Sequence, residues 1–549
     1  MEEKTDILIK GGIIVDGSGS EPYEADIGVS GDRITFIDRN SEAGIQRHTR
    51  VIDARGLTVT PGFIDTHSHS EFTLIADPRA EGKIWQGITT EINGNCGLSA
   101  APLSGEAAKQ READLMEFNI REKWSTFKEY FGLLERTGIS LNFVTLAGHG
   151  NIRASVSGYK DIKLTAPDRE RMHFFLAQAI EEGAIGLSTG LIYPPGVYSD
   201  TDELIDLCNA LMRSYRKAPV RECQGVKFMG SGIYASHMRS EGDNLIESIE
   251  EIVRIAKEAG VRVHISHIKT SGEKNWHKID GALQSIEAAR TDGAGVTCDR
   301  YPYTASSTDL DTVLPSWAYE GGVEEEIRKL TNDKNRERLK KEVLSEHPEM
   351  RYWESVYVSS VSSEKNRWTE GKSIAFIAHQ KNCDPVDMFF KILIEEKLRV
   401  GAIFSSMSEN NLKKFLSRPY VMIGTDSSAR SADGPTCRGK PHPRGFGSFP
   451  KFLGRYVRDD SLLNLSEAIH KITTLPSDTF GIHKRGVLKK GAFADIVVFD
   501  YEKIRDRATF DEPFLKPVGI QYVIVNGAAA VWEGESTGLR AGRVLRHGR

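Results

Sequence analysis

The sequence is poor in cysteine and has no long apolar run, and each shortage excludes a class of protein. Six cysteines are spread over 549 residues, too few for the disulfide framework of a small secreted domain. No stretch approaches the roughly 18 apolar residues that a membrane helix needs, so we expect no membrane association. The charged start, Met1–Lys4, has no apolar signal region. These features favour the reducing cytoplasm.

The charge balance gives no sign of a nucleic-acid partner. The net charge is −5 at pH 7 and the pI is about 6.3, so the chain lacks the basic excess of nucleic-acid binders. Hydrophobic residues make up 39% and charged residues 27%, which are values typical of a globular protein. A chain of this length suits one large barrel with additions.

Both ends of the chain are rich in strand-like segments. Asp6–Asp38 alternates β-branched runs with glycine-rich turns. Ala494–Asp500 and Val518–Trp532 have the same texture, with a turn at Asn526 and Gly527. Because chain ends often lie close together, we predict one small β-domain built from residues 1–60 and 485–549.

The middle of the chain alternates strand-like and helical segments. Thr165–Gly183 begins with a capping pair and has an apolar stripe, and Asn244–Ala259 is a second predicted helix that Gly260 ends. Over residues 61–484 this rhythm predicts an α/β protein with a (β/α)8 TIM-like barrel. A doubly wound sheet is the alternative, although no GxGxxG motif supports it. Residues 321–370 are highly charged, and we predict a helical insertion there.

Candidate metal ligands follow the predicted barrel strands, where barrel enzymes place their active sites. His67 and His69 end the run LTVTPGFIDTHSHS, and both share strand parity with Phe63 and Asp65. That parity predicts two imidazoles on one side. Cys96 lies in an NGNCG loop, a position better suited to a metal-binding thiolate than to a buried apolar side chain.

Two further histidines follow successive strands about one βα unit apart. His237 ends GIYASH and His267 ends VRVHISH, each with alternate apolar residues before it. His264 has the opposite parity, so we expect it to face the helices. His149 also follows a strand, and the residues alone leave open whether it lines the site or packs in the core.

Asp426 ends the run RPYVMIGTD on the parity of Met422 and Gly424. It is either a helix N-cap or the carboxylate that activates a metal-held water. A cysteine, two histidines and an open fourth position form a catalytic zinc site. Zinc brings the pKa of water close to neutrality, and a nearby carboxylate can pass the proton to a leaving amine.

These residues resemble the amidohydrolase superfamily, and most closely its D-aminoacylase (N-acyl-D-amino-acid deacylase) family. The resemblance covers nearly the whole chain. The stretches that carry it are PGFIDTHSHS, GNCGLS, EEGAIGLSTGLIYPPG, SHMRSEGD, SHIKTSG, DRYPYTASST and HPRGFGSFPKFLGRYVR.

The resemblance implies a role for each matching residue. The tight Zn²⁺ would be held by Cys96, His237 and His267, and a weaker second site by His67 and His69 with the shared Cys96. The general base would be Asp426. The residues implied to hold the substrate carboxylate are Lys269, Arg444, Tyr301 and Tyr193. Lys269 also shares a predicted face with His267, and Arg239 shares one with His237 and could serve instead.

The expected activity is hydrolysis of the amide bond of N-acyl-D-amino acids, a small-molecule substrate class, with the D configuration implied by the resemblance alone. Many other amidohydrolases bridge two metals with a carbamylated lysine after the fourth strand, but AIGLSTGLIYPPG contains no lysine. The alternatives are therefore less favoured: a cyclic-amide or dipeptide hydrolase of the same barrel, or a non-catalytic scaffold, which would lack ligands.

Overall fold

A computed structural model describes residues 5–39, 49–215, 221–223, 226–228 and 232–547 of the chain. Its centre is a parallel barrel formed from two sheets, ordered β6-β7-β8 and β19-β15-β14-β13-β10-β9. Strands β8 (Asn142–Thr145) and β9 (Ala147–Gly148) are one strand interrupted at a single residue. Counted this way, the described residues form eight parallel strands, and the (β/α)8 barrel is confirmed.

The other barrel strands are short. They are β6 (Phe63–Asp65), β7 (Ile88–Asn93), β10 (Gly186–Gly190), β13 (Ile233–His237), β14 (Arg262–Ile265), β15 (Val296–Arg300) and β19 (Val421–Ile423). The first and last strands meet where they end: the Asp426 N–H donates to the His67 carbonyl at 2.8 Å, and Ser68 pairs with Ser427. This closure places the two segments that follow β6 and β19 side by side.

The predicted helices are present with the predicted signals. Helix α6 (Ala166–Glu182) begins with a capping box between Thr165 and Asp168. Helix α8 (Leu245–Ala259) ends at Gly260, whose left-handed conformation suits glycine. Both helices pack their apolar faces into the large cluster that surrounds the barrel.

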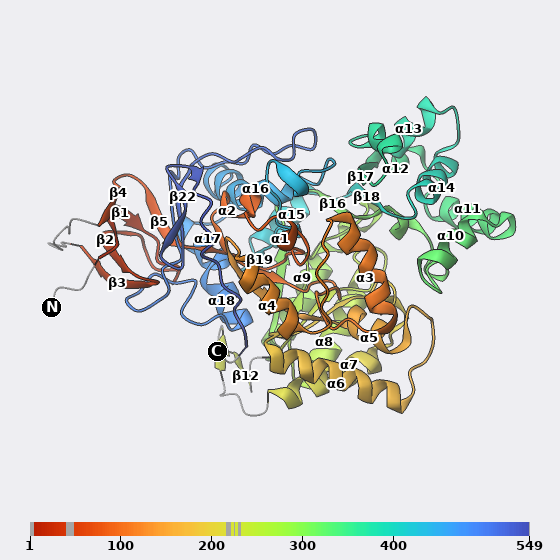
Figure 1. Ribbon diagram of the computed structural model, residues 1–549, viewed down its shortest axis with the longest axis horizontal. Coiled ribbons are helices and arrows are strands. Elements are labelled where there is room, and N and C mark those ends of the chain that lie inside the picture. The colour runs from red at the N-terminus through yellow and green to blue at the C-terminus, as the bar shows by residue number, and fades with distance from the viewer. Residues whose placement is uncertain (1–4, 40–48, 216–220, 224–225, 229–231, 548–549) are drawn as a thin grey trace.

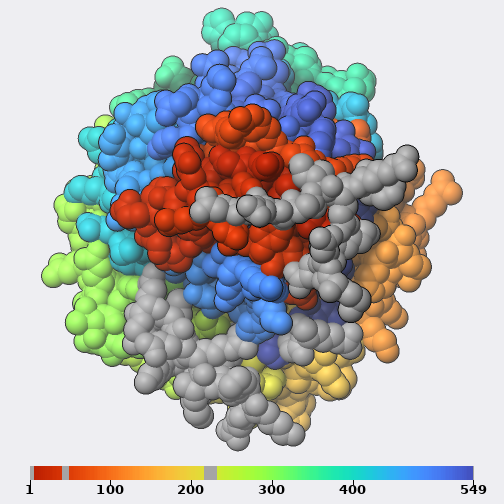
Figure 2. All heavy atoms as spheres, turned by 90° about the vertical axis from the view of Figure 1, so that its left-hand side faces the viewer, coloured from red at the N-terminus to blue at the C-terminus, as the bar shows by residue number. Residues whose placement is uncertain are grey.

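The two chain ends share one nine-stranded sheet (Figure 1). The N-terminal strands are β1 (Ile7–Ile14), β2 (Tyr23–Ser30), β3 (Arg33–Asp38), β4 (Arg50–Asp53) and β5 (Thr58–Pro61), and the C-terminal ones are β20 (Ile496–Phe499), β21 (Ile520–Val525), β22 (Ala528–Trp532) and β23 (Glu535–Ser536). Strand β20 pairs antiparallel with β5 and so joins the halves. Figure 2 shows the N-terminal strands in red beside C-terminal segments in blue.

A second hydrophobic core lies in the segment between β15 and β19, at the upper right of Figure 1. It extends from Leu310 to Ala402. The unit contains a sheet ordered β16-β18-β17, against which α12 (Met350–Ser355) and α13 (Ile374–Gln380) pack. Its other helices are α10 (Val323–Thr331), α11 (Asp333–Glu346) and α14 (Pro385–Glu395). The strands are β16 (Ala305–Asp309), β17 (Val356–Val361) and β18 (Val400–Ser405). The range 321–370, predicted as a helical insertion, lies inside this larger unit and contains β17.

Within the described ranges, no helix combines the length and apolar character that crossing a membrane requires.

Candidate metal centre

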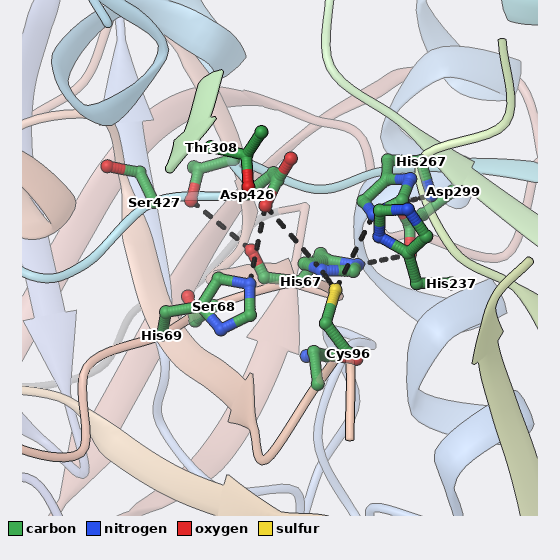
Figure 3. A network of polar contacts seen from close by, with 12 residues as sticks. His67, Ser68, His69, Cys96, His237, His267, Asp299, Thr308, Asp426 and Ser427 are labelled. Carbon is green, nitrogen blue, oxygen red and sulfur yellow. Dashed lines mark hydrogen bonds and ion pairs between the residues drawn. The ribbon is translucent and has the colours of Figure 1, made fainter. Parts of the chain in front are cut away.

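Residues that follow four of the barrel strands, and the last residue of a fifth, converge on one space (Figure 3). Cys96 follows β7, and its Sγ lies 3.3 Å from His67 Nε2 and 3.5 Å from His267 Nε2. His237 is the last residue of β13, and Asp426 follows β19. The structure therefore brings together all six residues predicted as metal ligands or base.

The first ligand set comprises Cys96, His237 and His267, which are all buried and have donor atoms within 4.8 Å of one another. Both ring nitrogens of His237 are buried and lack a hydrogen-bond partner in the described part of the chain. Such groups are costly to bury unless something binds them. One thiolate and two imidazoles suit Zn²⁺, so the residues present fit the implied metal.

A second set comprises His67, His69 and Cys96, with donor atoms again within 4.8 Å. It shares the Cys96 sulfur with the first set. His69 Nε2 lies 3.3 Å and His67 Nε2 lies 3.6 Å from Asp426 Oδ1. The side chain of His69 is 27% exposed whereas that of His67 is fully buried, so this set lies on the open side of the space.

Two carboxylates that the sequence analysis missed contact the Nδ1 atoms of His67 and His267 and so orient these imidazoles. Asp299 accepts from His67 Nδ1 at 3.2 Å and from the His267 backbone N–H at 2.8 Å. Glu241 lies 2.8 Å from His267 Nδ1. A carboxylate on the far ring nitrogen fixes the imidazole tautomer and direction in metal sites. The only available signal was position: Asp299 ends a strand-like run, and Glu241 follows His237 by four residues.

The residues predicted to hold a substrate carboxylate also surround this space. Arg444 Nη1 lies 2.8 Å from Asp426 Oδ2, and its guanidinium lies 4.6 Å from the centre of the Tyr301 ring. Lys269 Nζ lies 2.8 Å from His267 Nδ1 and also contacts Glu241. The Tyr301 hydroxyl is buried without a hydrogen-bond partner among the described residues.

Tyr193 lies beside His237, whereas the two remaining candidates point elsewhere. The Tyr193 ring is 5.1 Å from that of His237, and its hydroxyl bonds Thr308 at 2.9 Å. Arg239 is paired with Glu251 of α8 at 3.0 Å, so it is not the alternative anchor. His149 is buried and bonds Glu203 at 3.0 Å. Of the two alternatives, it is therefore a core residue and does not line the site.

The amidohydrolase family model matches residues 50–301 and 412–531. The chain belongs to this family. The gap in the match coincides with the inserted second core. A D-aminoacylase and an N-acyl-D-glutamate deacylase, both of Alcaligenes xylosoxydans xylosoxydans, are each 35% identical to this amidohydrolase. The alignments cover 98% and 100% of its chain, respectively, and 97% of each relative.

Solved structures agree with the sequence matches. The N-acyl-D-glutamate deacylase of Bordetella bronchiseptica, complexed with zinc and a phosphonate inhibitor that mimics the tetrahedral intermediate, superposes with a TM-score of 0.80 at 32% identity and covers 99% of this chain and 100% of its own. A D-aminoacylase structure gives the same values. The L-hydantoinase of Arthrobacter aurescens, at 15% identity and a TM-score of 0.56, shares the fold. The resemblance to the D-aminoacylase family is thus confirmed.

Neighbouring charges in the amidohydrolase site lower the pKa values of two side chains, Cys96 and Asp426. Burial raises the pKa of the Cys96 thiol, but the neighbouring His67 and His267 outweigh it and hold that pKa well below its usual range. Burial likewise opposes ionisation of Asp426, but Arg444 and His69 hold its pKa well below the ordinary value. These neighbours favour the thiolate form of Cys96, which is the form that binds metal, and the carboxylate form of Asp426.

For two strands, β14 and β6, strand parity predicted the wrong side of the barrel wall for the side chains. Val263 and Ile265 of β14 pack outward, among the helices. His264, expected to face the helices, instead lies inside the barrel, where its Nε2 bonds Asp299 at 2.7 Å and its ring contacts Phe480. His267 reaches the site because it lies beyond the strand end, in a left-handed conformation with φ of 36°.

The same correction applies to β6, where Phe63 packs in the outer cluster. The Asp65 carboxylate bonds Lys83 and Thr425 rather than facing the metal ligands. His67, two residues past the end of β6, turns back into the site.

Proposed function

We propose that this chain hydrolyses N-acyl-D-amino acids with Zn²⁺ as its metal, giving a carboxylic acid and a free D-amino acid. The observation that carries the proposal is the placement of Asp426 between two groups. On one side are the imidazoles of His67 and His69, and on the other is the Arg444 guanidinium at 2.8 Å. A carboxylate there can act on the amide bond of an N-acyl amino acid whose α-carboxylate is held next to it by Arg444.

We assign Cys96, His237 and His267 to the tight zinc, and His67 and His69 with Cys96 to a weaker position. When bound, zinc supplies Lewis acidity, which polarises the acyl carbonyl and makes water more acidic. Asp426 accepts the proton of the attacking water and returns it to the departing nitrogen. The imidazole of His69, partly open to solvent, is placed to donate toward the developing oxyanion.

The substrate carboxylate is bound, in this proposal, by Arg444 and Lys269, with the unpartnered Tyr301 hydroxyl as a third donor. Charge-assisted bonds of this kind are strong and directional. Tyr193, whose ring lies 5.1 Å from that of His237, is proposed as a further contact of this carboxylate. The D configuration rests on the named activities of the relatives.

A cyclic-amide hydrolase is the second candidate. No lysine is present in β10, Gly186–Gly190, where many amidohydrolases carry the bridging one. The linear amide is therefore the favoured substrate.

The test is a panel of N-acetyl amino acids in matched D and L forms, assayed for amine release by zinc-loaded protein. We expect turnover of D members and little or none of L members. Turnover confined to L members, or to cyclic amides, would contradict the proposal.

We further propose that residues 61–484 form the catalytic barrel and that residues 1–60 with 485–549 form the β-domain. The pairing of β5 with β20 supports this division. A cytoplasmic location is proposed because Cys96, Cys208, Cys298, Cys383 and Cys437 carry free thiols, as expected in a reducing compartment.

A further inference from the structure

A fully buried lysine connects the two chain segments that follow β6 and β19. Lys83, on α2 (Glu81–Ile84), has no exposed side-chain surface. Its Nζ lies 2.7 Å from Asp65 Oδ2, Ser68 Oγ and Thr425 Oγ1, and 2.8 Å from the Ser427 carbonyl. The first two acceptors bracket His67 in sequence, and the last two bracket Asp426.

Two carboxylates face this ammonium group: Asp65, and Glu91 on β7 with its Oε2 at 3.6 Å. The hydroxyls of Ser68 and Thr425 donate to Asp65 Oδ2 at 2.8 and 2.7 Å, which leaves their lone pairs facing Lys83. Asp65 Oδ1 accepts the backbone N–H of Thr425 at 2.8 Å and of His67 at 3.2 Å. A buried charge costs several kcal/mol unless it is paired and hydrogen-bonded, and this one meets both conditions.

The three residues assigned to the tight zinc lie outside this network. Cys96 and His267 follow other strands, His237 ends another, and among the described residues none of the three has a direct hydrogen bond or ion pair with Lys83. The nearest contact is indirect, since Glu91 Oε2 on β7 lies 3.6 Å from Lys83 Nζ and Asp65 also accepts the His67 N–H. His267 is oriented instead by Glu241 and by Asp299. Loss of Lys83 should therefore disturb one side of the metal centre and spare the other.

We propose that Lys83 is a positioning residue that fixes the general base Asp426 relative to His67 and His69. The contacts that it controls are the 3.3 Å and 3.6 Å separations between Asp426 Oδ1 and the two imidazoles. The role given to Asp426 rests on the proposed function, whereas the link between the two segments rests on the contacts alone. The backbone bonds from Asp426 N–H to the His67 carbonyl and from His69 N–H to the Ser427 carbonyl remain without Lys83, so the barrel should still close.

The test is Lys83→Met, which keeps an unbranched side chain one atom shorter and removes the charge and the donors. We expect one tightly held zinc per chain, as in the wild type. Titration of this one-zinc protein with Zn²⁺ should show the second binding event weakened at least tenfold. We also expect kcat to fall about 10²-fold with KM little changed, since a misplacement of about 1 Å has that cost.

Lys471→Met is the matched control, because Lys471 is another buried lysine, 2% exposed. Its Nζ donates to the backbone carbonyls of Leu416 and Arg418, away from the metal centre. We expect normal second-metal binding and normal kcat in this variant. Equal losses in both variants would show a general effect of removing a buried cation and would overturn the proposal.

Two smaller changes test the same link if Lys83→Met does not fold. Ser68→Ala should weaken the second metal, and Thr425→Val should lower kcat, because each removes one contact of Lys83 on one side. Wild-type behaviour of both would refute the assignment. If no N-acyl-D-amino acid is turned over by the wild type, the proposed function fails, while the Zn²⁺ titrations still decide the role of Lys83.

Discussion

The most informative perturbation of the proposed chemistry is Asp426→Asn. Asp426 has a left-handed backbone with φ of 50°, a conformation that asparagine tolerates better than most residues. Its backbone N–H bond to His67 does not depend on the side chain. The variant should therefore keep the local chain path, and it should keep the tight zinc because Asp426 is not in the Cys96, His237 and His267 set.

The expected loss follows from the two roles of the carboxylate. General acid–base catalysis contributes about 10²–10⁴ in rate, or about 3–5 kcal/mol of barrier, and asparagine cannot accept the proton. The amide oxygen can still face the Arg444 guanidinium, so we expect a stability loss below the 3–5 kcal/mol typical of a broken buried ion pair. With its acidic partner neutralised, Arg444 should bind the substrate carboxylate at least as well, so KM should stay level or fall.

The assay is kcat and KM for an N-acetyl-D-amino acid, measured with zinc content on the same sample. A zinc-replete variant within about fivefold of the wild-type kcat would fall far short of the general acid–base range and would refute the shuttle. Helix capping, the other reading of Asp426, has no support in the described chain, where the next helical turn begins at Gly434.

Other perturbations probe the metal, the anchor and the fold. Cys96→Ala or His237→Ala should abolish tight zinc binding, whereas His67→Ala should retain it. Metal analysis that finds full zinc content in the first two variants would refute the assignment of these residues as zinc ligands. Arg444→Met should bring the kcat/KM of the free acid close to that of its methyl ester, and an unchanged acid-to-ester ratio would place the anchor elsewhere. Burial opposes ionisation of Glu203, but His149 and Arg153 lower its pKa to about 2. The ionised form of Glu203 therefore stabilises the fold above the ordinary pKa of about 4.5. This stabilisation is lost as the pH falls toward 2. Glu203→Gln should therefore unfold more easily at pH 7, by about 3 kcal/mol at most, but not at pH 2; an equal difference in urea midpoints at both pH values would contradict this.

Sequence patterns predicted the barrel because its strands and helices carry their own signals. Thr165 and Asp168 form the expected capping box, and Asn526 and Gly527 form the expected turn between β21 and β22. Local patterns of this kind depend on neighbours in the chain, which the sequence displays directly.

The orientation of the site residues could not be predicted in the same way. Cys96, His267 and Asp426 all lie beyond their strands in left-handed conformations, with φ of 54°, 36° and 50°. The parity of β14 was taken from His267, which lies beyond the strand end in a left-handed conformation, so it gave the wrong side for His264 within the strand. Asp299 and Lys83 contact the site residues only after the barrel closes, and no sequence spacing predicts these contacts.

The shared sheet has a consequence for how the protein is made. Strand β5 cannot pair with β20 until that strand has been synthesised, about 430 residues later. At a synthesis rate of about 5–20 residues per second, that interval lasts roughly 20–90 s. During this time the N-terminal strands present an open edge that can pair with another nascent chain. Yield in cells should therefore depend on translation speed and on chaperones that cover this edge, and trimming the C-terminus should harm folding more than its distance from the metal suggests.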